Sequence, residues 1–104
     1  MSFNKLPQKI KIGFKEYEIV RKEEVFEDQE CYGKIDYNKE KIYISTRFNQ
    51  NQRNATFLHE MIHGIFEKLD MNDLRENEQV VNQIAVELYL IIKENPDIFK
   101  MTNI

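Results

Sequence analysis

The hydrophobic pattern of this chain of 104 residues changes its period once, in the segment 46–51. Before this segment, apolar residues alternate with polar ones, which is the pattern of half-buried strands. The alternating sets are Ile10, Ile12 and Phe14, which share one face, then Tyr17 and Ile19, and then Ile42 and Ile44. After the segment, apolar residues recur every three or four positions, which is the spacing of amphipathic helices. Strands followed by helices predict an α+β fold.

We expect a single domain over residues 1–104, in which a small antiparallel sheet of three to four strands is followed by two helices. Both helices are expected to pack on one face of the sheet, and the charged stretch 23–30 is expected to form a loop. The first helix is expected over 51–69, with Asn49 or Asn51 as its N-cap. The second is expected from about Arg75 to Glu94, with a buried face made of Val80, Val81, Ile84, Ala85, Leu88, Ile91 and Ile92. It should end there because the residue before Pro96 avoids the helical region.

Composition excludes several classes of protein. Apolar residues make up 41% of the chain and charged residues 32%, which is ordinary for a folded soluble domain. The net charge of −3 is uneven, because residues 1–52 carry 10 basic and 9 acidic side chains whereas residues 53–104 carry 5 and 9. No basic surface with interleaved aromatic residues is indicated, so we expect no nucleic-acid partner.

The expected location is the cytoplasm. No apolar run reaches membrane-spanning length, and the N-terminus lacks the apolar core of a signal peptide, so we expect no membrane association. Cys31 is the only cysteine, so no internal disulfide can form, and a reducing compartment is the natural setting.

The only two histidines, His59 and His63, stand four positions apart, and Glu60 directly follows the first. On a helix, residues four apart lie on one face about one turn from each other, so both imidazoles can point at one metal ion. The adjacent glutamate then stays free to act as a base on metal-bound water. This HExxH pattern predicts His59 and His63 as Zn²⁺ ligands and Glu60 as the catalytic base.

A catalytic zinc site normally has three protein ligands. Glu67 is excluded in a regular helix, because eight residues separate it from His59 by about 12 Å. A third histidine of the metzincin kind is also absent, so we expect a carboxylate that is reached by a chain reversal. The acidic residues considered are Asp70, Asp73, Glu76, Glu78 and Glu87. Helical periodicity favours Glu78, which adjoins Val81 and Ala85 on the inward side of the second helix.

Asn82 lies one turn after Glu78 and is the other polar residue on that face. Its side-chain carbonyl is a candidate partner for the second ring N–H of a histidine ligand, a contact that fixes the tautomer. An ordinary amide on the helix surface is the alternative, and spacing does not separate the two. The segment 41–45 is the expected edge for an extended substrate. Three tyrosines are candidate oxyanion donors or, alternatively, cross-strand packing residues: Tyr32, Tyr37 and Tyr43.

The HExxH segment together with Glu78, Val81, Asn82 and Ala85 resembles the active-site helices of the ImmA/IrrE family of metallopeptidases. The chain is most similar to the short phage-borne members of that group, and the similarity spans nearly its whole length. It also includes the segments 9–13 and 32–36, Tyr17, Thr56 and Asn95-Pro96. The resemblance implies a minimal zincin-like fold with Zn²⁺ held by His59, His63 and Glu78, and with Glu60 as general base. No residue can be matched to a tyrosine, histidine or arginine that stabilises the transition state.

The expected function is that of a small zinc metallo-endopeptidase acting on a protein or peptide substrate, in which Glu60 activates zinc-bound water. One alternative is a non-catalytic zincin-fold protein of phage or mobile-element origin that captures a partner protein. Another is an α+β domain in which the motif is accidental and the histidines belong to the core. Two histidines and a carboxylate also suit non-haem iron, although Glu60 would then have no evident task. No pattern in the sequence indicates the cleavage preference or the oligomeric state.

Overall fold

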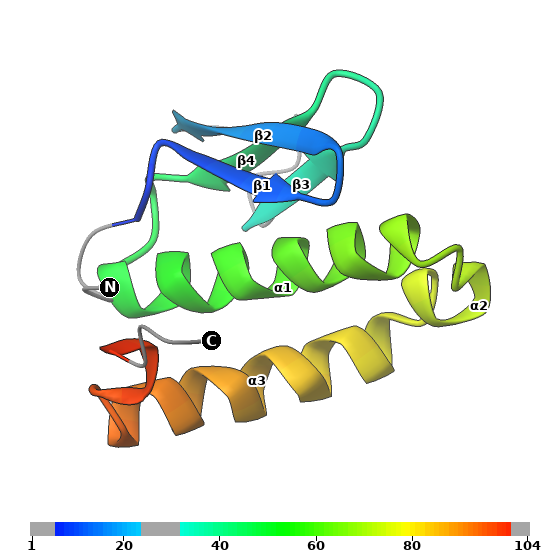
Figure 1. Ribbon diagram of the computed structural model, residues 1–104. Helices are drawn as coiled ribbons and strands as arrows, with labels where there is room; N and C mark the ends of the chain where they lie inside the picture. The colour runs from blue at the N-terminus through cyan, green and yellow to red at the C-terminus, as the bar shows by residue number, and fades with distance from the viewer. Residues whose placement is uncertain (1–5, 24–31, 101–104) are drawn as a thin grey trace.

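Strands and helices form successive layers in the computed structural model of the chain, which describes residues 6–23 and 32–100 (Figure 1). The strands are β1 (Lys9–Ile12), β2 (Lys15–Lys22), β3 (Gly33–Asp36) and β4 (Lys41–Ser45). They are followed by α1 (Gln50–Lys68), the short α2 (Asn72–Arg75), α3 (Glu78–Glu94) and a final 3₁₀ turn, η1 (Ile98–Lys100). The α+β class is confirmed. Most of the predicted loop over 23–30, and Cys31, lie outside the described residues.

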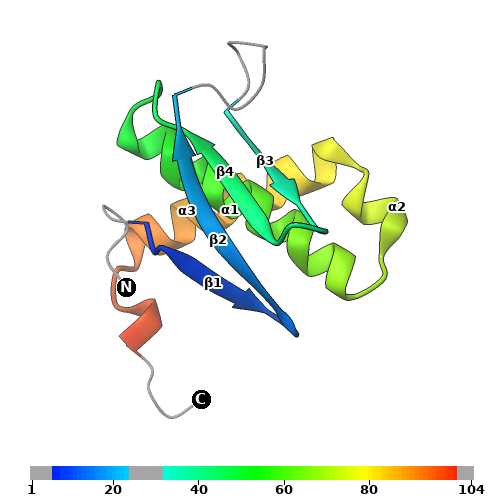
Figure 2. The ribbon, with the colours of Figure 1, turned by 90° about the horizontal axis from the view of Figure 1, so that it is seen from above.

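The sheet is mixed, which corrects the prediction of a purely antiparallel sheet. Its strand order is β1-β2-β4-β3 (Figure 2). The outer pairs, β1 with β2 and β3 with β4, are antiparallel hairpins, whereas β2 and β4 run parallel in the middle. Alternation of apolar and polar residues is the same for either strand direction, so the sequence pattern does not indicate how two hairpins join.

The inner face of the sheet packs on α1. Tyr17 and Ile19 of β2 are buried there, together with Ile42 and Ile44 of β4, as the alternation predicts. Phe14 was expected on the same face but is fully exposed. It follows Gly13, whose φ of 64° reverses the chain and turns the next side chain outward.

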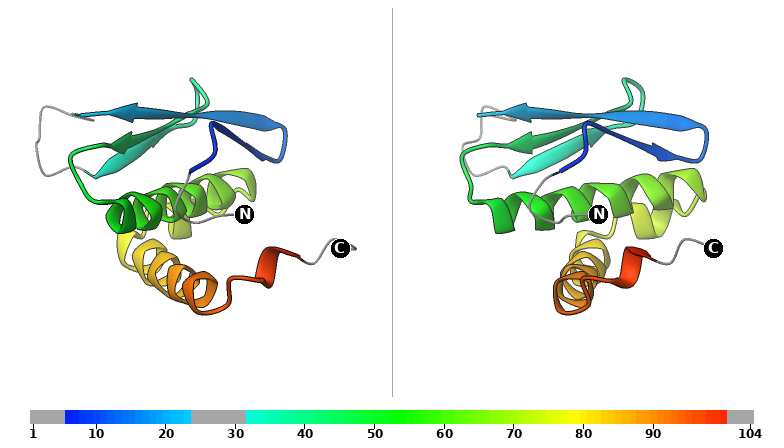
Figure 3. Two further views of the ribbon diagram at one scale, coloured as in Figure 1. Left: turned by 90° about the vertical axis from the view of Figure 1, so that its left-hand side faces the viewer. Right: turned by 60° about the vertical axis from the view of Figure 1, so that its left-hand side comes forward.

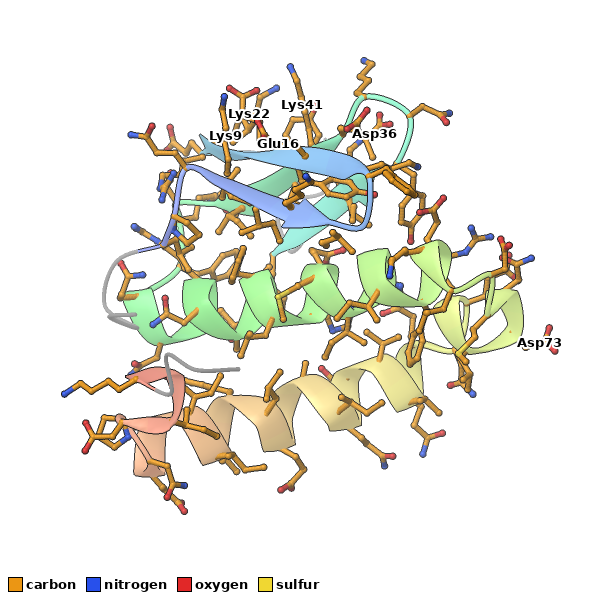
Figure 4. All side chains as sticks on the ribbon, in the orientation of Figure 1. Lys9, Glu16, Lys22, Asp36, Lys41 and Asp73 are labelled. Carbon is orange, nitrogen blue, oxygen red and sulfur yellow. The ribbon has the colours of Figure 1, made fainter. Side chains whose placement is uncertain are left out.

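The outer face of the sheet is charged. Figure 4 shows Lys9, Glu16, Lys22 and Lys41 pointing away from α1. Lys9 Nζ lies 3.5 Å from Glu16 Oε1, and both side chains are well exposed. Exposed ion pairs of this kind add little stability. This face is therefore a solvated surface, and both histidines lie on the other side of the sheet, on α1.

The two long helices form two layers, which corrects the prediction that both pack on the sheet. α1 lies between the sheet and α3, and α3 packs against α1 (Figures 1 and 3). Because a single helix covers only a narrow stripe of its neighbour, α3 buries just Val81, Ala85 and Ile92. Ile84 and Ile91, which were expected in the buried face, are 42% and 45% exposed. Among the described residues, no helix is both long and apolar enough to span a bilayer.

The helix ends follow from capping residues. The side chain of Asn49 accepts a hydrogen bond from the N–H of Gln52, so Asn49 rather than Asn51 caps α1. Asn77 caps α3 in the same way, which places the start of the second long helix at Glu78 instead of Arg75. The intervening residues, expected as an irregular connection, include the single turn α2.

A close approach between β3 and α1 depends on Gly33. A Cβ atom at this position would lie 2.6 Å from Thr56 Cγ2 of α1 and 2.6 Å from the carbonyl oxygen of Tyr43. Both distances are far below normal van der Waals contact, and the second involves backbone that cannot move aside. The absence of a side chain at Gly33 therefore lets this strand lie close to the helix that carries both histidines.

We predict that Gly33→Ala lowers the free energy of unfolding by about 2–3 kcal/mol, because the added methyl group overpacks the contact with α1 and β4. Urea denaturation of the purified protein measures this change. The double variant Gly33→Ala with Thr56→Ser should recover part of the loss, since serine lacks the clashing Cγ2 but the Tyr43 carbonyl remains. A stability of Gly33→Ala equal to wild type would contradict the packing argument.

Candidate metal centre

Three predicted ligands converge at the junction of α1 and α3. Glu78 Oε2 lies 3.0 Å from His59 Nε2, and Glu78 Oε1 lies 2.8 Å from His63 Nε2. The two imidazole rings meet edge to face with their centroids 5.0 Å apart. One ligand atom from each of the three residues lies within 4.8 Å of the others, so a single ion can contact all three.

The chain reversal after α1 brings Glu78 to the histidines. Asp70 adopts a left-handed conformation, with φ of 56°, and its N–H donates to the carbonyl of Glu67. The N–H of Met71 donates to the carbonyl of Phe66, which completes a Schellman motif and ends α1 sharply. The turn of α2 and the Asn77 cap follow, so that Glu78 becomes the first residue of α3.

The other acidic residues beyond α1 do not join this cluster. Asp73 projects from α2 away from the rest of the molecule (Figure 4). Glu76 ends α2 and lies 3.5 Å from the guanidinium of Arg75. Asp70 and Glu87 are exposed to solvent and belong to no group of potential ligands among the described residues. The choice of Glu78 from helical periodicity therefore agrees with the geometry.

The second nitrogen of His63 contacts the backbone of α2. Burial lowers the pKa of His63 most strongly, while the charge of Glu78 and a hydrogen bond to the carbonyl of Arg75 act in the opposite direction. Because Nε2 faces Glu78, the nitrogen that donates to this carbonyl is Nδ1. The backbone of Arg75 at the end of α2 therefore lies close to the His63 ring, and an orienting role of Asn82 stays a prediction. Asn82 lines the same cleft, but the described residues include no hydrogen bond from its side chain.

The arrangement of His63 and Glu78 can accommodate a cation between them. With its proton on Nδ1, a neutral His63 presents the lone pair of Nε2 to a carboxylate oxygen 2.8 Å away. Two acceptors at that distance repel each other unless a proton or a metal ion lies between them. Burial disfavours the extra proton, because it lowers the pKa of the imidazole. Two imidazole nitrogens and one carboxylate also match the donor set of catalytic zinc.

Glu60 lies beside the cluster but is not part of it. Only 7% of its surface is exposed, because it faces the sheet from α1. Burial, with a smaller contribution from the charge of Glu78, raises the pKa of Glu60 to about 8. Glu60 therefore lies next to the three potential ligands without belonging to their group.

The cluster opens into a cleft of about 530 Å³ that is bordered by β3, α1 and α3. Figure 2 shows the N-terminal half of α3 emerging beneath the sheet on the β3 side. This corrects the expected position of a substrate, because β4 lies inside the sheet whereas β3 forms the cleft wall. Tyr32 and Tyr37 line the cleft, while Tyr43 lies on the outer face beneath Lys22 and Lys34.

Comparisons of this chain with protein-family models, with curated proteins and with solved structures find no match. The resemblance to ImmA/IrrE metallopeptidases therefore stays a prediction from the motif residues. The functional interpretation depends on the chemistry and geometry of the cluster itself.

We predict that the protein purified without chelators or a histidine tag contains about one zinc ion per chain, and that Glu78→Ala weakens zinc affinity by at least about 100-fold. Glu78 supplies the only carboxylate in the ligand group of the described residues. Elemental analysis measures the zinc content, and competition with a chromogenic chelator measures the zinc affinity. Glu87→Ala is the matched control, because it removes an exposed carboxylate from the same helix. Equal zinc affinity of the two variants would contradict the assignment of Glu78.

We also predict that the metal-free protein loses stability as the pH rises from about 5 to about 8. In the folded protein the pKa of Glu60 is about 8, whereas its ordinary value is 4.5, so the folded state binds the proton more tightly. The protonated Glu60 therefore contributes its full stabilisation at a pH below 4.5, the ordinary pKa. This contribution to the free energy of unfolding is lost as the pH rises through the folded-state pKa of about 8, at a rate of at most about 1.4 kcal/mol per pH unit. Denaturation of chelator-treated protein at several pH values tests this. In Glu60→Gln the free energy of unfolding should vary less with pH. If wild type and Glu60→Gln show the same pH dependence of unfolding, a raised pKa of Glu60 is ruled out.

Proposed function

We propose that this protein is a small zinc-dependent metallopeptidase of the HExxH type. The observation that carries the proposal is the convergence of Glu78 on both histidines, with the buried Glu60 beside them. In this assignment His59, His63 and Glu78 hold Zn²⁺, and the cleft provides room for a substrate. A phage-borne origin and a cytoplasmic location remain predictions from the sequence.

When bound, zinc would supply Lewis acidity, which lowers the pKa of water and polarises a carbonyl group. Glu60 would accept a proton from the attacking water and deliver it to the departing nitrogen. The water oxygen forms a bond to the carbonyl carbon, and the C–N bond of the peptide breaks. The raised pKa of Glu60 suits both steps, because a base with a pKa near the working pH can take up and release a proton.

The walls of the cleft favour an extended peptide as substrate. β3 forms one wall and runs beside α1, so a peptide in the cleft would lie along this strand. The opposite wall is formed by small and apolar side chains from α1 and α3, namely Ala55, Ala85 and Val86. Residues of modest size flanking the scissile bond fit such a wall.

We predict that Glu60→Gln abolishes hydrolysis of a quenched fluorescent peptide library, with at least about a 100-fold loss, while zinc content stays at the wild-type level. Glutamine keeps the size of the side chain but cannot accept the proton. Wild-type activity should disappear with a chelator and return on addition of zinc. Turnover by Glu60→Gln at the wild-type rate would exclude Glu60 as the base.

A non-catalytic protein that captures a partner is the second candidate. It is favoured by the large apolar side chains that α1 and α3 expose, among them Ile65, Ile84 and Ile91. In that case zinc-loaded wild-type protein should cleave no member of the peptide library. A partner complex should then persist in Glu60→Gln and be lost in Ile84→Glu. Chelator-sensitive cleavage by the wild type would exclude this candidate as the sole function.

A further inference from the structure

Tyr37 occupies the end of the cleft wall, in the turn that joins β3 to β4. The carboxylate of Asp36 shapes this turn, since its Oδ1 accepts hydrogen bonds from the N–H groups of Asn38, at 3.1 Å, and Lys39, at 2.9 Å. The same contacts lower the pKa of Asp36, the bond from Lys39 most strongly, so the turn is held by a charged acceptor at neutral pH. Tyr37 is thus presented from a structured turn.

A lysine from the neighbouring hairpin fixes the backbone of Tyr37. Lys15 Nζ donates to the carbonyl oxygen of Tyr37 at 3.1 Å and also to Glu67 Oε1 at 3.1 Å. Both charged side chains are mostly buried, and Glu67 lies one turn beyond His63 on α1. This bridge ties the turn to the helix that carries the histidines. The position of Tyr37 relative to the metal centre therefore depends on side chains from three elements.

Two cations also restrain the ring of Tyr37. Lys15 Nζ lies 5.9 Å from the ring centroid, and Arg75 Cζ lies 5.4 Å from it. Arg75 is the residue whose carbonyl contacts His63, so a single residue links the tyrosine ring with a metal ligand. Cations near an aromatic ring stabilise it in a defined orientation.

The hydroxyl of Tyr37 is available as a donor. It makes no hydrogen bond within the part of the chain that the structure describes, and Tyr37 lines the cleft with both histidines, Glu60 and Glu78. Burial raises the pKa of Tyr37 to about 12; Arg75 opposes this shift, and the carboxylates of Glu60, Glu67 and Glu78 add to it. The group therefore keeps its proton at neutral pH, and these carboxylates lie close enough to act on it.

We propose that the Tyr37 hydroxyl is the oxyanion donor of the peptidase, giving a hydrogen bond to the scissile carbonyl oxygen as that oxygen gains negative charge. The inference rests on the proposed peptidase function and assigns its missing transition-state stabiliser. The other two tyrosines fit this role less well. Tyr32 packs on Phe48 with ring centroids 4.4 Å apart, and Tyr43 lies outside the cleft.

The test compares Tyr37→Phe with Tyr43→Phe, a matched removal of a hydroxyl from a tyrosine outside the cleft. With the peptide library, Tyr37→Phe should lower kcat by about 10²–10³-fold with little change in KM, because the bond forms only in the transition state. Zinc content and thermal stability should match the wild type, since the ring and its cation contacts remain. Tyr43→Phe should stay within about threefold of wild type.

A second measurement does not require turnover. Calorimetry with N-phosphoryl-leucinamide, whose tetrahedral phosphoryl group resembles the transition state, should give about 10–100-fold weaker binding to zinc-loaded Tyr37→Phe than to wild type. If wild type cleaves peptides and Tyr37→Phe equals it in both assays, the role of Tyr37 is overturned and the peptidase function stands. If wild type neither cleaves peptides nor binds the phosphoryl compound, the proposed function fails, and the inference fails with it.

Discussion

The attachment of α3 to α1 combines a narrow buried apolar stripe with polar contacts at the N-terminus of α3 and in its second half. At the N-terminal end Glu78 bonds to His59 and His63, and further along the Tyr89 hydroxyl donates to Asn51 at 2.9 Å. The ligand cluster is therefore also the contact that holds the start of α3 in place. Because the three side chains converge only when both helices are packed, a metal ion bound there would add directly to the stability of the fold. The site and the fold are stabilised by the same interaction.

The second constraint is the close contact between α1 and the sheet. Gly33 allows β3 to approach Thr56, and Gly64, directly after His63, leaves space for the side chains of Ile12 and Ile35. This approach removes water from around Glu60, and burial is the main reason that its pKa rises. An ionised Glu60 without a nearby cation would be costly in this position. A metal ion held by the neighbouring histidines would offset that cost.

Much of the fold and the ligand set follows from patterns within single elements. Helical spacing predicted the faces on which His59, His63 and Glu78 lie, and these three side chains meet in the structure. The parallel pairing of β2 with β4 could not be predicted, because it depends on contacts between residues far apart in the sequence. The alternation of apolar and polar residues is the same for parallel and antiparallel strands. The layer order was also missed, and for this reason Ile84 and Ile91 were expected inside although they are exposed.

The parts of the site that the sequence did not indicate are those made by backbone or by turns. The carbonyl of Arg75 orients His63, yet every residue has a carbonyl, so no residue type marks this contact. Tyr37 reaches the cleft because an aspartate turn and the Lys15 bridge place it there, and three tyrosines were equivalent until those contacts were known. The wall of the cleft that α1 and α3 do not form comes from β3 and Tyr37, in the first half of the sequence. The geometry of the cleft therefore depends on how tightly the β3–β4 hairpin is held to α1.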